Sequence, residues 1–132
     1  MWEYGGVVKN EEKLKKGLQE IENLKEASKD LDVRPDSEGY QDLMLAFDLQ
    51  ASLVSSESTL ISALSREESR GAHQRDDYKK INNDFNVNMR VKFDSDENIL
   101  LSKDKVPTLK KDLESLITNT KEIDNFEGML LE

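Results

Sequence analysis

The longest helical pattern in the chain lies in residues 40–64, YQDLMLAFDLQASLVSSESTLISAL. Its large apolar residues recur at helical spacing, so we expect one amphipathic helix from Gly39 or Tyr40 to about Ser69, capped at its C-terminal end by Gly71. The apolar stripe that indicates this helix consists of Tyr40, Leu43, Phe47, Ala51, Val54, Ile61 and Leu64. Serines and a threonine fill its middle. Because these residues are mediocre helix formers, the helix should depend on packing against neighbours.

A surface helix is expected before this stretch, from Asn10 to Leu31. Its apolar positions, spaced by four, three and three residues, are Leu14, Leu18, Ile21 and Leu24. Asn10 is a good N-cap, and two glutamates place negative charge in the first turn, where the helix dipole favours it. Pro35 disfavours helical backbone in the residue before it, so a turn should separate the two helices.

The pattern changes period after the long helix. Apolar Val87, Met89, Val91 and Phe93 alternate with polar residues, which predicts a half-buried strand. The stretch Ile99–Ser102 can return as its hairpin partner. A short final helix is expected beyond Pro107, and a loose tail after Asn119. Its apolar positions are Leu109, Leu113, Leu116 and Ile117.

The expected fold is therefore mainly α, an antiparallel helical bundle with an appended C-terminal β-hairpin and short helix. We divide it into a bundle domain, residues 1–84, and a hairpin with helix and tail, residues 85–132. The opening MWEYGGVV is typical of the last turn of a helix cut off upstream. Two long helices alone leave apolar faces uncovered, so either a preceding helix or a second copy of the chain should cover them.

Composition limits the functions that this chain can have. Its 132 residues hold about one domain, and the formal net charge of −9 disfavours nucleic acid and anionic membrane surfaces. Without cysteine and with His73 as the only histidine, disulfides, iron–sulfur ligation and a multi-histidine metal site are excluded within the chain. It has neither a long apolar run nor a secretory start, so we expect a cytoplasmic protein with no direct membrane insertion.

The stretch SREESRGAHQRDDY, residues 65–78, gathers three of the five arginines and the histidine. Arginine is preferred over lysine where a planar group must be bound at two points. The alternative without a specific function is a solvated helix end, with Arg66 and Arg70 paired to Glu67, Glu68 or Asp76. Exposed ion pairs of this kind are common and weak.

Within this stretch, SRGAHQRDDY resembles the S-R-G-A-H-x-R-x-D-[FY] segment near the C-terminus of succinate dehydrogenase and fumarate reductase flavoproteins. The opening MWEYGGVVKNEEKL resembles the family's M-W-x-x-x-G-x-x-R-x-x-x-x-L, and VPTLKKDLESLI resembles its V-P-x-L-P. Ala72 and Arg75 favour the succinate/fumarate branch over L-aspartate oxidases. Lys79 and Lys80 stand near the place where most members have an arginine, a departure from the pattern.

The resemblance implies a spectrin-repeat-like three-helix bundle whose first helix is truncated at Met1. It implies FAD in the full-length family, held by a Rossmann-type domain that this chain does not contain, since its six glycines cannot form G-x-G-x-x-G. We expect no cofactor, metal or catalysis in this chain. The residues expected to dock the bundle onto a flavin domain are Arg66, Arg70, His73, Arg75, Asp76 and Tyr78.

Three hypotheses about function follow. The first is a non-catalytic domain that packs on the flavin-binding domain of the same or another chain, or on an iron–sulfur subunit, and so lies peripheral to a membrane through a complex. The second is a free-standing acidic helical interaction module, able to form a homodimer through exposed bundle faces. The third, an enzyme in its own right, has the least support: acidic pairs such as Asp94 and Asp96 normally face water, and the spacing of a calcium loop is missing.

Overall fold

A computed structural model describes residues 1–35, 39–95, 98–110 and 113. Most of the helix expected beyond Pro107, and the tail after Asn119, lie outside the described residues. The elements in chain order are α1 (Trp2–Gly5), β1 (Val8–Lys9), α2 (Glu11–Ser28), α3 (Gln41–Ser65), β2 (Gln74–Arg75), a 3-10 turn (Asn83–Phe85), β3 (Val87–Phe93) and β4 (Ile99–Lys105).

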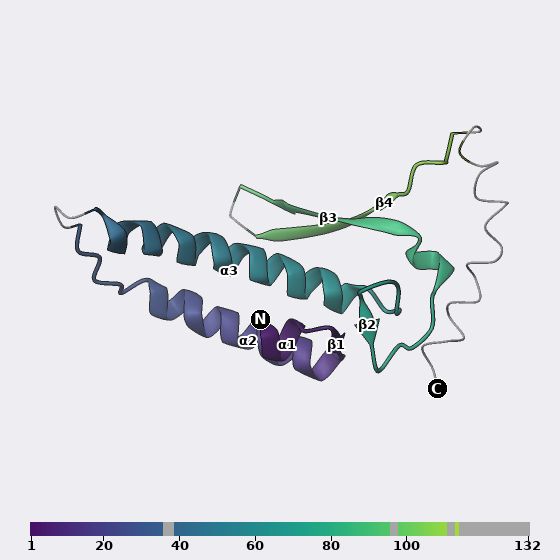
Figure 1. The fold of residues 1–132 in the computed structure, drawn as a ribbon, viewed down its shortest axis with the longest axis horizontal. Coiled ribbons are helices and arrows are strands. Elements are labelled where there is room, and N and C mark those ends of the chain that lie inside the picture. Colours follow the sequence, from purple (N-terminus) through teal and green to yellow (C-terminus); the bar gives the residue numbers. More distant parts are fainter. Residues whose placement is uncertain (36–38, 96–97, 111–112, 114–132) are drawn as a thin grey trace.

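The arrangement is a helical pair with a hairpin laid along it. Figure 1 shows α2 and α3 side by side, with the short α1 against α2 and the β3–β4 hairpin along the other side of α3. Strands β3 and β4 pair antiparallel, while β1 pairs in parallel with β2, so the chain start meets the segment after α3. The mainly α fold with an appended hairpin is confirmed.

Helix α2 follows the sequence pattern closely. The Asn10 side chain caps it by accepting a hydrogen bond from the Lys13 amide at 2.9 Å. Leu14 and Ile21 are buried against α3. Between them lies Gly17, whose lack of a side chain allows α1 to pack closely on α2. A Cβ built at Gly17 would lie 2.6 Å from the Cβ of Tyr4. The helix ends at Ser28, three residues earlier than predicted.

The apolar stripe predicted for α3 joins the core only at its C-terminal end, where Leu64 packs against it. The residues that pack on α2 are Leu53, Leu60 and Ala63, with Leu49 and Leu64 partly covered. The N-terminal part of the predicted stripe is exposed: Tyr40, Leu43, Phe47, Ala51 and Val54. The reason is that α3 is apolar on two faces, and periodicity does not say which of the two meets the neighbouring helix.

The end of α3 also differs from the prediction. The helix stops at Ser65, and Arg66 already has extended backbone (φ −90°, ψ 99°). Gly71 has φ +55° and lies in a tight turn, where the backbones of Arg70 and His73 exchange hydrogen bonds of 2.9 and 3.0 Å. Gly71 is thus a turn residue rather than the helix cap, and Arg66 and Arg70 do not share a helical turn.

The hairpin was predicted correctly at β3, whereas β4 runs on to Lys105 instead of stopping at Ser102. Met89 and Val91 lie on the side of β3 that faces α3. The ammonium of Lys103 sits 4.0 Å from the ring centre of Phe85, a cation–π contact that joins β4 to the 3-10 turn. The division at residues 84 and 85 stays a prediction.

Candidate docking loop after the long helix

Arg75 is the centre of the segment between α3 and β3, which we call the 66–82 loop. Its side chain is almost fully buried. One guanidinium nitrogen donates to the carbonyls of Ala63, at 2.9 Å, and Leu64, at 3.2 Å, in the last turn of α3. These carbonyls have no partner within the helix, so Arg75 closes α3 with a positive charge at the negative end of its dipole.

Asp77 connects the same arginine to the other helix. Its two oxygens accept from Nε and the second guanidinium nitrogen of Arg75, each at 2.7 Å, and one of them also accepts from the Glu11 amide at 2.8 Å. The carboxylate therefore sits at the positive N-terminal end of α2. The hydrogen bond from Arg75 outweighs burial and lowers the pKa of Asp77 to about 2.

Glu68 forms a second buried cluster, because its side chain is fully enclosed. It accepts hydrogen bonds from Arg66 at 2.5 Å, from Arg70 at 3.0 Å and from the Asn82 amide at 2.8 Å. Burial alone would raise the pKa of Glu68, but the hydrogen bonds from Arg70, Asn82 and Arg66 outweigh it and bring the pKa to about 2. Pairing of Arg66 and Arg70 with Glu68 was among the interpretations above, but the Glu68 carboxylate is enclosed rather than solvated.

Arg66 also ties the loop to the hairpin. Its guanidinium donates to the carbonyls of Phe85, at 2.8 Å, and Val87, at 2.6 Å. The start of β3 is therefore held to the residue that ends α3, and both buried clusters contribute to fixing the shape of the loop.

His73 is half-buried at the turn of the loop. Its Nε2 lies 3.2 Å from the Arg66 carbonyl, and since a carbonyl only accepts, Nε2 carries the proton. Burial lowers the pKa of His73, and the nearby charges of Lys9, Arg75 and Arg66 act in the same direction, against the hydrogen bond to Arg66. Among the described residues, Nδ1 has no hydrogen-bond partner, so it presents a lone pair.

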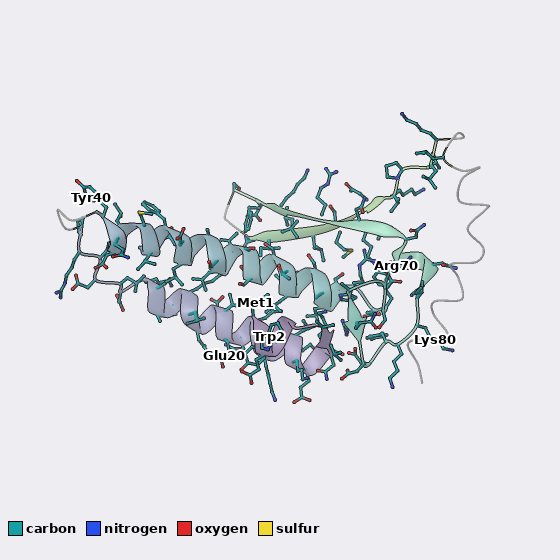
Figure 2. All side chains as sticks on the ribbon, viewed as in Figure 1. Met1, Trp2, Glu20, Tyr40, Arg70 and Lys80 are labelled. Carbon is teal, nitrogen blue, oxygen red and sulfur yellow. The ribbon has the colours of Figure 1, made fainter. Side chains whose placement is uncertain are left out.

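The remaining predicted residues lie nearer the surface. Asp76 is exposed and accepts from the Asn10 amide group at 3.3 Å. The Arg75 guanidinium lies 4.9 Å from the ring centre of the half-buried Tyr78. The side chain of Arg70 is 37% exposed and is labelled at the loop in Figure 2. The loop thus brings all six predicted residues together, but Arg66 and Arg75 are turned inward.

Sequence reasoning missed two residues that hold the loop, Ser69 and Asp77, and it did not predict that Glu68 is buried. The Ser69 hydroxyl accepts from the Arg75 amide at 2.8 Å and donates to the Tyr78 carbonyl at 2.8 Å. A signal for Asp77 existed, because the aspartate of the S-R-G-A-H-x-R-x-D pattern falls on Asp77 and not on Asp76. Nothing in the pattern distinguished Glu68 from its neighbour Glu67.

The described residues do not fit a metal ion or FAD. They bring together no group of three His, Cys, Asp or Glu side chains able to hold a metal. Every buried side-chain polar atom among them already has a hydrogen-bond partner within the chain. The loop is therefore built to hold its own shape, and we derive no chemical step through a cofactor. Among the helices described, none is long and apolar enough to cross a membrane.

The fold and the loop together define a small helical domain with an appended β-hairpin. The family described as fumarate reductase flavoprotein C-term matches residues 1–123, and the chain belongs to this family. An uncharacterized FAD-dependent oxidoreductase of Methanocaldococcus jannaschii is 34% identical over 92 residues, which is 70% of this chain and 16% of that protein. One subunit of the fumarate reductase (CoM/CoB) of Methanothermobacter marburgensis is 35% identical over 79 residues, 59% of this chain and 14% of that protein.

Solved structures agree with the sequence relatives. E. coli quinol fumarate reductase FrdA matches with a TM-score of 0.75 and 27% identity, over 83% of this chain and 20% of that one. Sdh1 of Mycobacterium smegmatis matches with a TM-score of 0.73 and 25% identity, over 85% of this chain and 20% of that one. This chain spans a fifth or less of the length of these relatives. The resemblance to the succinate dehydrogenase and fumarate reductase flavoproteins is confirmed.

Proposed function

We propose that the chain is a non-catalytic domain that packs on the flavin-bearing part of a succinate- or fumarate-converting oxidoreductase. The 66–82 loop is its docking element. Arg66 and Arg75 hold the loop from inside, and Arg70, His73, Asp76 and Tyr78 present its outer surface.

One observation carries this proposal: the loop is held by two ionic clusters, each built around one buried charged side chain, Glu68 in the first and Arg75 in the second. Taking charges out of water is costly, and a buried ion pair adds little net stability compared with apolar packing. Such clusters can be retained because they fix one conformation. A fixed loop shape is useful where the loop must meet a second, rigid surface.

Further partners follow from the same proposal. The flavin-bearing part can belong to the same chain or to another one, and an iron–sulfur subunit is a second candidate neighbour. A cytoplasmic location, peripheral to a membrane through a complex, is compatible with the similarity to solved structures of quinol fumarate reductase.

A second candidate function is a free-standing acidic interaction module that forms a homodimer. The observation in its favour is the exposed apolar surface on the N-terminal half of α3, since large exposed apolar patches mark interaction sites. The side chains of Leu43, Met44, Leu45 and Phe47 are between 37% and 63% exposed.

The test uses the full-length flavoprotein that contains this domain. We expect His73→Ala and Arg70→Ala to lower the temperature at which FAD fluorescence appears on heating, because a weakened interface frees the flavin-bearing part. Arg34→Ala, which removes an exposed arginine paired with Asp32, should leave that temperature unchanged.

A merely structural role for Arg70 and His73 gives a different result. In that case the isolated 132-residue chain loses as much thermal stability as the full-length protein does, as followed by far-UV circular dichroism. Equal losses in both proteins would refute docking through these two residues.

A further inference from the structure

We propose that the groove between α3 and β3 receives a polypeptide segment of the flavin-bearing part of the same chain, and that this segment binds through hydrogen-bond donors. This inference rests on the proposed function and names the surface and the chemistry of the contact.

The groove is open and has a volume of about 610 Å³. One wall is the hydroxyl-rich face of α3, the other is the apolar side of β3, and the 66–82 loop closes one end. Residues that line it include Ser55, Ser58, Ser62, His73, Met89 and Val91. Figure 1 shows the hairpin lying beside the C-terminal half of α3.

A second hollow, of about 350 Å³, continues the groove past the chain start. The two share Gly5, Lys9 and Ala72, so they form one surface. The second hollow is walled by Met1 and by Trp2, which is 89% exposed. A long surface with a polar part and an apolar end suits an extended stretch of chain better than a compact small molecule.

The hydroxyl groups along the groove determine which hydrogen-bonding groups an occupant must carry. Three of them donate their protons to the carbonyl one turn back along α3: Ser58 to Val54 at 2.8 Å, Thr59 to Ser55 at 2.8 Å and Ser62 to Ser58 at 2.7 Å. Their oxygens keep lone pairs that can accept hydrogen bonds. Together with Nδ1 of His73, the groove presents acceptors, which call for amide or side-chain donors in the occupant.

The basic residues of the groove do not make it an anion site. Arg66 directs its guanidinium to Glu68 and to two backbone carbonyls. Burial lowers the pKa of His73 and favours its neutral form. Lys9 is 7% exposed and donates to the Val7 carbonyl at 3.1 Å. A dicarboxylate would therefore meet acceptor oxygens and find few free donors.

Two observations indicate that the segment comes from the flavin-bearing part: the length of chain outside this domain in its relatives, and the continuity of the groove with the 66–82 loop. The relatives devote 14% and 16% of their length to the part that matches this chain, so most of each chain lies outside this domain. His73 belongs both to the docking loop and to the groove lining, and a body that meets the loop therefore also reaches the groove.

The test places a photo-cross-linking amino acid, p-benzoylphenylalanine, at Thr59 in the full-length flavoprotein, with mass spectrometry to map the products. Thr59 is exposed and lines the groove, so the bulky probe can be accommodated. A second probe is placed at Arg70, on the docking loop. A third probe, the control, is placed at Glu20, which is exposed on α2 and labelled in Figure 2.

We expect cross-links from Thr59 and from Arg70 to the flavin-bearing part of the same chain, and none from Glu20. Cross-links from Arg70 without any from Thr59, or cross-links from Thr59 only to a different polypeptide, would overturn the groove proposal and leave the proposed function intact. No cross-link to the flavin-bearing part from either position would overturn both.

Discussion

Arg75 and Asp77 form a two-point ion pair, with both contacts at 2.7 Å, that joins the last turn of α3 to the first turn of α2. Each member carries the charge that the helix end beside it favours: a cation at the carbonyls of α3 and an anion at the amide of Glu11. The pair therefore links two antiparallel helices, and the proposed docking surface surrounds it.

Replacing Arg75 should destabilise the domain strongly. Arg75→Lys keeps a charge but cannot hold two carboxylate oxygens and the carbonyls of α3 together, so we expect a loss of about 3 kcal/mol in the free energy of unfolding. Arg34→Ala is the matched control, because Arg34 and Asp32 are also two residues apart but exposed, and it should cost less than about 1 kcal/mol. Urea unfolding measures both, and equal losses would contradict this role of the ion pair.

Acid should weaken the domain through Glu68 and Asp77. Both carboxyls have pKa values of about 2 in the folded chain, below their ordinary values of 4.5 and 3.8. Their contribution to stability is therefore complete above about pH 4.5 and is lost as the pH falls toward 2. Unfolding curves measured at pH 7, 4 and 3 should show this loss.

Glu68→Gln isolates one of these two groups. A neutral amide cannot neutralise Arg66 and Arg70, so stability at pH 7 should fall by about 2 kcal/mol, and the remaining acid sensitivity should be smaller. Glu67→Gln, at the exposed neighbouring position, should change neither. A Glu68→Gln variant with the full acid sensitivity of the wild type would show that the Glu68 carboxylate is not the responsible group.

His73 should titrate below the ordinary histidine range and carry its proton on Nε2 when neutral. Because its folded pKa is lowered, folding disfavours protonation, so His73 destabilises the fold as the pH falls below about 6.5. Nitrogen-15 NMR can follow it without assignment, as it is the only histidine. An ordinary pKa or the Nδ1-protonated tautomer would disagree with the geometry.

Gly17 should not tolerate a side chain. A Cβ at this position would lie 2.6 Å from the Cβ of Tyr4 and 2.9 Å from a methyl of Leu60. Overpacking costs about 1–3 kcal/mol, and the better helix propensity of alanine returns at most about 1 kcal/mol. Gly17→Ala should therefore lower the melting temperature, while Glu20→Ala on the exposed face should leave it nearly unchanged. Retained stability in Gly17→Ala would show that α1 moves away without cost.

Local signals in the sequence were enough to predict most of the elements. The cap at Asn10, the period-two pattern of β3 and the break between α2 and α3 are all decided by neighbouring residues, and all were found. The buried face of α3 was not predicted, because Leu43 and Phe47 fit a helical stripe as well as Leu53 and Leu60 do. Only the position of α2 decides between them.

The 66–82 loop shows a second limit of prediction from sequence, because long-range contacts determine its structure. Arg75 ends α3 from a position ten residues beyond Ser65, so a prediction from local propensity extended the helix too far. Its charge partner could be inferred from the family pattern, but the burial of Glu68 depends on three groups that meet only in the fold: Arg66, Arg70 and the Asn82 amide. The sequence therefore indicated that these residues lie together in one loop, without separating those that hold the loop from those that face outward.

Docking of the 66–82 loop on a flavin-bearing body is tested most directly by hydrogen–deuterium exchange, comparing the isolated 132-residue chain with the full-length flavoprotein. Peptides from α2 serve as the internal control that the isolated chain is folded. We predict that amides in residues 70–78 exchange at least tenfold more slowly in the full-length protein, while those of α2 exchange alike in both. Equal exchange of residues 70–78 in the two proteins, with α2 protected in both, would contradict the account.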